Sequence, residues 1–268
     1  MTAPGPPRGI LHPDAHADGG GHERLAPSDG LRGLVEHYWF VWWDLRGQPP
    51  RVAETLPHPS VHVVARDGAV RVLGVVRGRF TTTLSDMGRV VGIKFRPGAF
   101  APFLGRAVTT LSDRSLPLVD VFGADAAALE AIMLDDAPRP RLAARIDAFL
   151  TAHRPPPDAQ VDVVADVVAA IMADRAITKV EHVAERTGLG VRTLQRLFRH
   201  YVGVTPKWVI QRYRLHEAAE RLRAGDGAPL ATLALELGYA DQAHFINDFR
   251  RVVGATPASY MKRVTRDP

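Results

Sequence analysis

The segment GLGVRTLQRLFRHYVGVTP, residues 188–206, recurs in altered form as GYADQAHFINDFRRVVGATP, residues 238–257. The opening glycines of the two copies are 50 residues apart, and the glycines of the closing Gly-x-Thr-Pro motifs are 51 apart. A duplicated unit fixes an architecture before any single motif does. The C-terminal part of this chain is therefore expected to contain two related structural units.

The first copy has the pattern of two helices joined by a short turn. Residues 178–181 read as a capping box, with Thr178 as the cap of a helix that Gly188 ends. After the turn, a second helix at about 191–202 separates into two faces. Its inner face carries Leu194, Leu197, Phe198 and Tyr201, and its outer face carries Arg192, Gln195, Arg196 and Arg199.

Arg and Gln are the side chains that make paired hydrogen bonds to guanine and adenine edges in the major groove of DNA. The plainer interpretation is an amphipathic helix whose charged face is merely solvated. Because the whole helix-turn-helix arrangement recurs, we favour a DNA-recognition helix.

The second copy keeps the apolar pattern but loses most of the charge. Its second helix, at about 241–253, has an inner face of Phe245, Phe249 and Val252 and an outer face of Ala243, Ile246, Asn247 and Arg250. We therefore expect the first unit to supply most of the base recognition.

A connector helix of about 20 residues is predicted between the copies, with Thr205 as its cap, Pro206 at its first position and Gly225 as its end. Such a helix spans about 30 Å, close to the roughly 34 Å between successive major-groove faces of B-DNA. Two partners are open for its basic residues Arg212, Arg214, Arg221 and Arg223, namely phosphates or acidic neighbours. For Arg212 we expect a phosphate contact.

Charge and composition narrow the function classes. Residues 1–174 hold 18 Lys/Arg and 20 Asp/Glu, whereas residues 175–268 hold 16 and 9, so the basic excess lies at the C-terminus and favours a polyanion partner there. The chain of 268 residues has no cysteine, which excludes disulfides, thiolate metal sites and a cysteine nucleophile. No membrane-length apolar run and no signal-peptide pattern is present, so we expect a cytoplasmic protein.

The N-terminal part of the sequence has a different residue pattern. Residues 1–27 are rich in Pro and Gly and are expected to be a disordered arm, and residues 28–122 are expected to form a mainly β domain. The predicted strands are 35–43, 61–65, 69–76, 79–84 and 89–95, with Asp67-Gly68 as a tight turn between two of them. The overall fold class is thus α+β with two domains.

Two residue groups of the β domain are candidates for binding. Trp39, Trp42 and Trp43 fit a plain core better than a ligand pocket, although they could line one. Glu54, His58 and His62 could bind a metal on a β scaffold, and the alternative functional hypothesis is a metal-binding sensor or an enzyme activity through these residues. Otherwise the histidines are hydrogen-bonding groups of a loop. For a small-molecule effector we take Trp39, Trp42, His58 and His62 as the candidate residues.

Residues 123–174 have helical spacing, with predicted helices at 127–134, 142–150 and 161–172. The proline triplet at 155–157 separates the last two and reads as a stiff connector. We interpret this segment as a helical linker, and its apolar faces leave a dimerisation surface open.

Residues 175–263 closely resemble the DNA-binding domain of the AraC/XylS family of bacterial transcription regulators. Gly238-Tyr239, Phe245, Phe249-Arg250, Gly254 and Thr256-Pro257 match that family's C-terminal signature. The resemblance implies an all-α domain in which both recognition helices contact bases. Its implied contacts are Arg192, Gln195, Arg196 and Arg199, then Gln242, Ala243, Ile246, Asn247 and Arg250. Asn247 departs from the Arg that the family often has at this position.

The N-terminal domain resembles one that accompanies this module in actinobacterial and related regulators. The resemblance is carried by Tyr38-Trp39, Leu56-Pro57-His58-Pro59, residues 88–98 and Phe103-Leu104. It implies a cupin-like β-barrel that senses an effector, without indicating which one.

These observations favour a transcription regulator that binds promoter double-stranded DNA and responds to a small molecule. A DNA-repair alkyl-transfer enzyme that carries the same module would need a reactive cysteine, which this chain lacks. We therefore expect no enzyme activity and no cofactor. Contact with RNA polymerase and formation of a homodimer are left open by the sequence.

Overall fold

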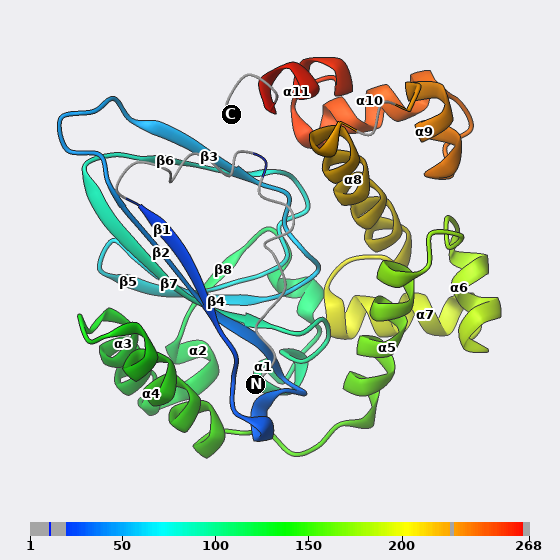
Figure 1. Ribbon diagram of the computed structural model, residues 1–268. Helices are drawn as coiled ribbons and strands as arrows, with labels where there is room; N and C mark the ends of the chain where they lie inside the picture. The colour runs from blue at the N-terminus through cyan, green and yellow to red at the C-terminus, as the bar shows by residue number, and fades with distance from the viewer. Residues whose placement is uncertain (1–10, 12–19, 226–227, 265–268) are drawn as a thin grey trace.

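The computed structural model describes residue 11, residues 20–225 and residues 228–264. Its N-terminal part is dominated by antiparallel strands, and its C-terminal part is helical (Figure 1). This is the α+β division that the sequence predicts. Among the described residues, no helix combines the length and the apolar character that crossing a membrane would require.

Two antiparallel sheets form the β domain. The larger has the strand order β1-β2-β7-β4-β5-β8 and the smaller pairs β3 with β6. The strands are β1 Gly21–Leu25, β2 Val35–Asp44, β3 Arg51–Thr55, β4 His62–Arg66, β5 Ala69–Leu73, β6 Phe80–Leu84, β7 Met87–Phe95 and β8 Ser115–Pro117. Side chains from both sheets, among them Ala53, Val64, Leu84 and Val90, share one apolar cluster. The two sheets therefore face each other across this cluster.

The five predicted strands are present as β2, β4, β5, β6 and β7. They are rich in β-branched and aromatic residues, and in β4 and β5 every second side chain is buried. The Asp67-Gly68 turn is also confirmed. Both residues have positive φ, 50° and 76°, and they join Arg66 directly to Ala69 across the β4–β5 hairpin.

The predicted disordered arm needs a correction. Most of it, residues 1–10 and 12–19, lies outside the described residues, but Gly21–Leu25 form strand β1. Gly21 pairs with Trp42 of β2, and a side chain there would place its Cβ 2.2 Å from the Trp42 ring. Gly21, which the sequence assigns to a flexible arm, therefore lies in a strand and leaves room for the Trp42 indole to pack against it. Leu11 is also buried, and its amide donates to the carbonyl of Glu54 over 3.0 Å.

The outer face of the large sheet is covered by helices. Helices α3 Ala126–Leu134 and α4 Arg139–Ala152 pack their apolar residues, such as Leu129, Ile146 and Leu150, against the strands. The apolar residues that left a dimerisation surface open are therefore buried within the chain at these two helices. The shorter helical turns are η2 Asp29–Leu31, α1 Ala101–Leu104, η3 Val108–Leu111, α2 Val119–Phe122 and η4 Gly123–Asp125.

The C-terminal part is a tandem pair of helix-turn-helix units. Its helices are α5 Ala159–Ala173, α6 Val180–Thr187, α7 Val191–Leu197, the π-helical continuation η5 Phe198–Val202, α8 Pro206–Ala224, α9 Leu230–Glu236, α10 Gln242–Val253 and α11 Pro257–Val264. The first unit shares a core with α5. The second shares one with the end of α8, with α11 and with Leu11 and Leu56 of the N-terminal part. Figure 1 shows α8 running from one unit to the other.

The helix ends test the predicted caps. Thr205 caps α8, since its Oγ1 accepts from the Trp208 amide over 3.1 Å, and Gly188 and Gly225 end their helices in the left-handed conformation. The capping box at Thr178 is wrong. The residue before α6 is Lys179, which makes no side-chain cap, and the Thr178 amide donates to His182 Nδ1 over 3.4 Å.

Candidate nucleic-acid interface

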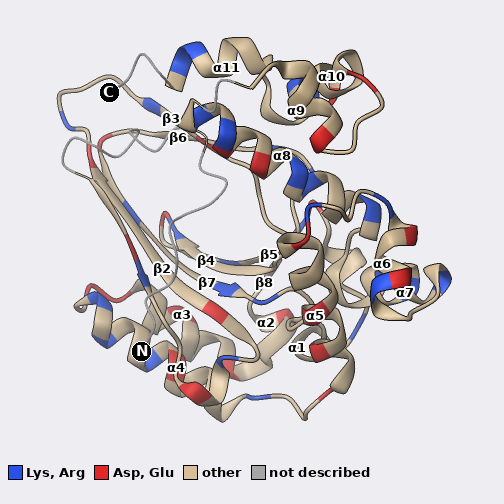
Figure 2. Ribbon diagram, turned by 45° about the vertical axis from the view of Figure 1, so that its right-hand side comes forward, with Lys and Arg blue, Asp and Glu red and all other residues tan. Residues whose placement is uncertain are grey.

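The outer face of α7 and its continuation is formed by exposed polar side chains. Leu194, Leu197 and Phe198 are buried on the inner face. The outer residues Arg192, Gln195, Arg196 and Arg199 are all exposed. The ion pairs found among the described residues of this half use other cations: Arg175, Arg186, Arg214, Arg221 and Arg251. The arginines of the α7 face are thus available to an external partner, and Figure 2 shows basic segments there at one edge of the molecule.

Helix α10 presents the corresponding face of the second unit. Its first turn is capped by Asp241, whose carboxylate accepts from the His244 amide over 2.7 Å. Gln242, Ala243, Asn247 and Arg250 are exposed, and Ile246 is half-buried. This face is positioned by buried Phe245 and Phe249, so the predicted apolar scaffold is confirmed in both units.

A buried polar group also holds α10. The hydroxyl of Tyr239 donates to Asp248 over 3.1 Å, and Arg251 forms an ion pair with the same carboxylate. Burial and the Asp248 charge raise the pKa of Tyr239 well above its usual range. The hydroxyl therefore stays protonated and fixes the turn before α10 to the helix itself.

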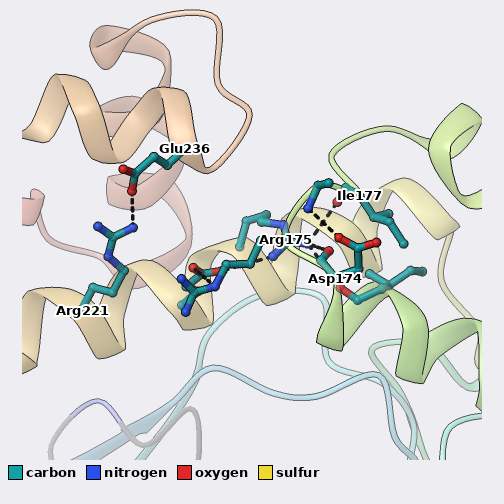
Figure 3. A network of polar contacts seen from close by, with 9 residues as sticks. Asp174, Arg175, Ile177, Arg221 and Glu236 are labelled. Atoms are coloured by element: carbon teal, nitrogen blue, oxygen red, sulfur yellow. Dashed lines mark hydrogen bonds and ion pairs between the residues drawn. The ribbon is translucent and has the colours of Figure 1, made fainter.

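The arginines of α8 contact other parts of the protein, and Arg223 donates to the Tyr260 hydroxyl of α11 over 3.1 Å. Arg221 pairs with Glu236 of α9 over 2.5 Å (Figure 3). Arg214 pairs with Glu217 over 3.1 Å. Arg214 is only 3 % exposed at its side chain and also donates to the carbonyls of Ile171, Asp174 and Ile177. Of the two partners that the sequence left open, acidic neighbours are the ones found for Arg214 and Arg221. The connector is thereby fastened to both units.

Arg212 corrects the expected phosphate contact. It is 2 % exposed, lies over the Trp208 ring at 4.5 Å and donates to the carbonyls of Arg77 and Gly78 in the β domain. Burial and the nearby Arg251 lower its pKa to about 10. A side chain this enclosed cannot reach a DNA backbone. Its sequence position on a basic helix gave no signal of the domain contact that encloses it.

The four effector candidates do not form one site, although Trp39 and His62 are in contact. Trp39 donates from Nε1 to His62 Nδ1 over 3.3 Å, on the opposite sheet face from Trp42. His58 instead lies in a loop, with its ring 4.5 Å from the His216 ring of α8. Trp43 is buried and donates to the carbonyl of Ser85 over 3.0 Å, so for this tryptophan the core interpretation is confirmed.

Trp42 lines a cavity of about 550 Å³ between the large sheet and the α3–α4 connection. Phe40, Val91 and Leu142 form the apolar part of the cavity wall. The charged groups at the cavity pair with one another: Arg89 with Asp136 over 2.9 Å, and Arg139 with Glu23. The Arg139 guanidinium also lies 4.1 Å from the centre of the Trp42 ring. Apart from Trp42, sequence reasoning missed this site, whose only signal was Pro138-Arg139-Pro140.

The metal hypothesis is wrong for the residues that carried it. Glu54 pairs with Arg79 over 3.1 Å, His58 faces α8, and His62 lies on the inner sheet face beside Trp39. No group of three histidine, aspartate or glutamate side chains suited to a metal occurs in the described part of the chain. The two prolines around His58 bend the backbone, so His58 and His62 do not share a strand.

A buried cationic group lies beside His62. The Lys94 ammonium donates to Glu36 over 2.8 Å and is nearly enclosed. Burial, followed by the Lys94 charge, lowers the pKa of His62 to about 3, and the same two causes lower that of His37 to about 2. Both imidazoles are therefore neutral at physiological pH.

Paired helix-turn-helix units with exposed polar faces are the arrangement of a DNA-binding module. A family described as "Helix-turn-helix domain" matches residues 183–263, and a domain of unknown function, DUF6597, matches residues 23–117. The C-terminal third of the chain therefore contains a helix-turn-helix domain of the AraC type.

Similar curated proteins match over the same segment. The HTH-type transcriptional activator RhaS of Pectobacterium carotovorum is 37% identical over 76 residues, which are 28% of this chain and 27% of that protein. An uncharacterised HTH-type transcriptional regulator of Haemophilus influenzae is 31% identical over 86 residues, 32% of this chain and 28% of that one. The chain spans about a quarter of the length of the curated relatives that it matches.

Among solved structures, an apo variant of ToxT from Vibrio cholerae is similar with a TM-score of 0.42 and 12% identity, covering 84% of this chain and 97% of that one. The C-terminal domain of AraT, a response regulator from Geobacillus stearothermophilus, has a TM-score of 0.34 and 23% identity, covering 37% and 82%.

Proposed function

We propose that this protein is a sequence-specific transcription regulator that places α7 and α10 in successive major grooves of promoter DNA. The observation that carries the proposal is the exposed Arg192, Gln195, Arg196 and Arg199 face on the first of two equivalent helices. The 19-residue α8 spans about 28 Å, close to the distance between successive grooves. Base recognition falls mainly to α7, because α10 offers a less basic face.

A selection of bound sequences from random double-stranded DNA tests this function. We expect an enriched site with two half-sites about one helical turn apart. Arg196→Ala should relax the preference at one base position, with a loss of about 1–3 kcal/mol for the preferred base. Arg141→Ala, which removes an equally exposed charge from α4, is the matched control and should leave the selected site unchanged. Absence of any enriched sequence would refute the proposal.

The β domain, which the sequence places at 28–122, is proposed to bind a small-molecule effector, with the Trp42 cavity as the candidate site. The cavity size is in the range of small-molecule sites, and aromatic wall with a few polar groups is typical of them. We further propose that the protein forms a homodimer and contacts RNA polymerase on the promoter. We also propose that it acts in the cytoplasm.

A thermal-shift screen of metabolites tests the effector site. A compound that raises the melting temperature of the wild type should fail to do so in Ala137→Phe, which fills the cavity mouth. Ala127→Phe adds the same ring at an exposed position of α3 outside the cavity and should retain the shift. Equal shifts in both variants would place the effector elsewhere.

A further inference from the structure

The two recognition helices end at equivalent glycines, and the β domain contacts both ends. Gly203 closes the first helix with φ 90°, and Gly254 closes the second with φ 82°. These two glycines are equivalent positions of the sequence repeat, 51 residues apart. Two segments of the β domain reach them: residues 112–113 after η3, and residues 77–79 before β6.

At the first end, the hydroxyl of Ser112 donates to the carbonyl of Gly203 over 2.5 Å. A Cβ on Gly203 would lie 2.9 Å from that hydroxyl oxygen and 3.0 Å from Val108 Cγ1. The helix end is therefore packed directly against the β domain, and its left-handed glycine permits the approach.

At the second end, Arg79 Nη1 donates to the carbonyl of Val253 over 2.7 Å. The same nitrogen forms an ion pair with Glu54 of β3 over 3.1 Å. A Cβ on Gly254 would lie 1.8 Å from Arg79 Nη1, so only glycine leaves room for this contact. The end of α10 is thus fixed to a charged pair of the small sheet.

The two contact segments are joined to each other. The Asp113 carboxylate accepts from the Arg77 amide over 2.7 Å and forms an ion pair with the Arg77 side chain. The Asp113 amide donates to the carbonyl of Val75 over 3.0 Å. Between the two ends, Arg212 of α8 donates to the carbonyls of Arg77 and Gly78. One polar chain therefore links both recognition helices and the connector through the β domain.

We propose that Ser112 and Arg79 are positioning residues that fix the separation and relative orientation of the two recognition helices, and thereby the half-site spacing that the protein accepts. The assignment rests on the proposed DNA-binding function. One inserted base pair shifts a half-site by about 3.4 Å and rotates it by about 35°, which a fixed pair of helices cannot follow. Without the two contacts, α8 alone sets the spacing and tolerates more variation.

The test compares the wild type with the double variant Ser112→Ala, Arg79→Ala on the DNA site selected with the full-length wild type. Affinity is measured by fluorescence anisotropy for that site and for sites with one base pair inserted or removed between the half-sites. We expect the wild type to lose about tenfold or more on each altered site, and the double variant to lose about threefold or less. A site with one half-site scrambled reports base contacts alone and should bind both proteins equally.

Two further variants separate positioning from general stability. Arg79→Lys with Ser112→Thr keeps a donor at both ends and should restore the wild-type spacing penalty. Arg71→Ala removes an arginine that bonds to Ser115 within the large sheet and should leave the penalty unchanged. If the double variant is poorly folded by circular dichroism, each single variant is measured and should show a smaller relaxation of the same sign.

The outcomes distinguish the two proposals. A wild type that selects no sequence refutes the regulatory function, and the positioning role falls with it. A wild type that selects a site and discriminates spacing, together with a double variant that discriminates equally, overturns the positioning role alone.

Discussion

At the scale of single residues, the Trp39–His62 contact couples a hydrogen bond to a protonation state. The indole N–H donates to His62 Nδ1, which can accept only while that nitrogen is unprotonated. Burial and Lys94 lower the pKa of His62 to about 3, so the folded chain resists protonation over a wide range. In the unfolded chain the imidazole returns to its ordinary pKa, near 6.5.

This difference predicts acid sensitivity. Below about pH 6.5 the unfolded chain binds a proton at His62 that the folded chain does not, so the free energy of unfolding falls as the pH falls toward 3. We expect the His62 share to be about 1–2 kcal/mol between pH 7 and pH 5. Urea denaturation at both values should show a smaller loss in His62→Gln than in the wild type. Equal losses would contradict the assignment.

At the scale of elements, the connector helix α8 depends on its first turn. Thr205 is extended, its hydroxyl accepts from the Trp208 amide, and Pro206 occupies a position that needs no amide hydrogen. Only two residues, Val204 and Thr205, separate this helix from the Gly203 end of the first recognition helix. Fraying at this cap would therefore reach the residues that join the two units.

Removal of the cap gives a measurable cost. Thr205→Ala should lower the free energy of unfolding by about 1 kcal/mol, because the Trp208 amide loses its acceptor. Thr232→Ala makes the same chemical change at an exposed position within α9 and should change it by less than about 0.5 kcal/mol. Urea denaturation of the two variants checks the difference, and similar costs would argue against a capping role.

Elements with strong periodicity were predictable, and elements defined by a partner were not. The helices of both units and strands such as β2 and β7 follow from their own apolar spacing. Strand β1 was missed because its glycine is explained only by the Trp42 ring of the neighbouring strand. Gly88 and Gly92 have the same relation to Trp43 and Trp39, so three tryptophans lie against three glycines across strand pairs.

The candidate interface divides in the same way. The outward faces of α7 and α10 could be predicted, since helical spacing alone determines which side chains share a face. The contacts of Arg212 could not be predicted. A basic residue on a basic helix has the same local sequence pattern whether its side chain binds a phosphate or another domain. Its partners are carbonyls of residues 77 and 78, more than 130 positions away in sequence.

At the scale of the whole molecule, Arg212 distinguishes charge that binds DNA from charge that joins domains. Because its side chain is enclosed between α8 and the β domain, its removal should weaken the domain contact without changing the number of phosphate contacts. Arg250 is exposed on the outer face of α10 and lacks this enclosure. The two arginines form a matched pair in the same half of the chain.

We expect Arg250→Ala to reduce the slope of log affinity against log salt by about one, because its exposed cation releases counterions from DNA. We expect Arg212→Ala to leave the slope unchanged while lowering the melting temperature. Anisotropy titrations across a salt series and a thermal melt measure both quantities. A reduced slope for Arg212→Ala with an unchanged melting temperature would show that its side chain reaches DNA.

The stacking of Arg212 on Trp208 also gives the protein an optical label of its own. The guanidinium lies 4.5 Å from the indole centre, and the same side chain is bonded to the β domain. Separation of the domains would expose Trp208 to water and shift its ultraviolet emission to longer wavelength. With Trp39, Trp42 and Trp43 replaced by phenylalanine, the remaining emission would report domain docking in real time, without an attached dye.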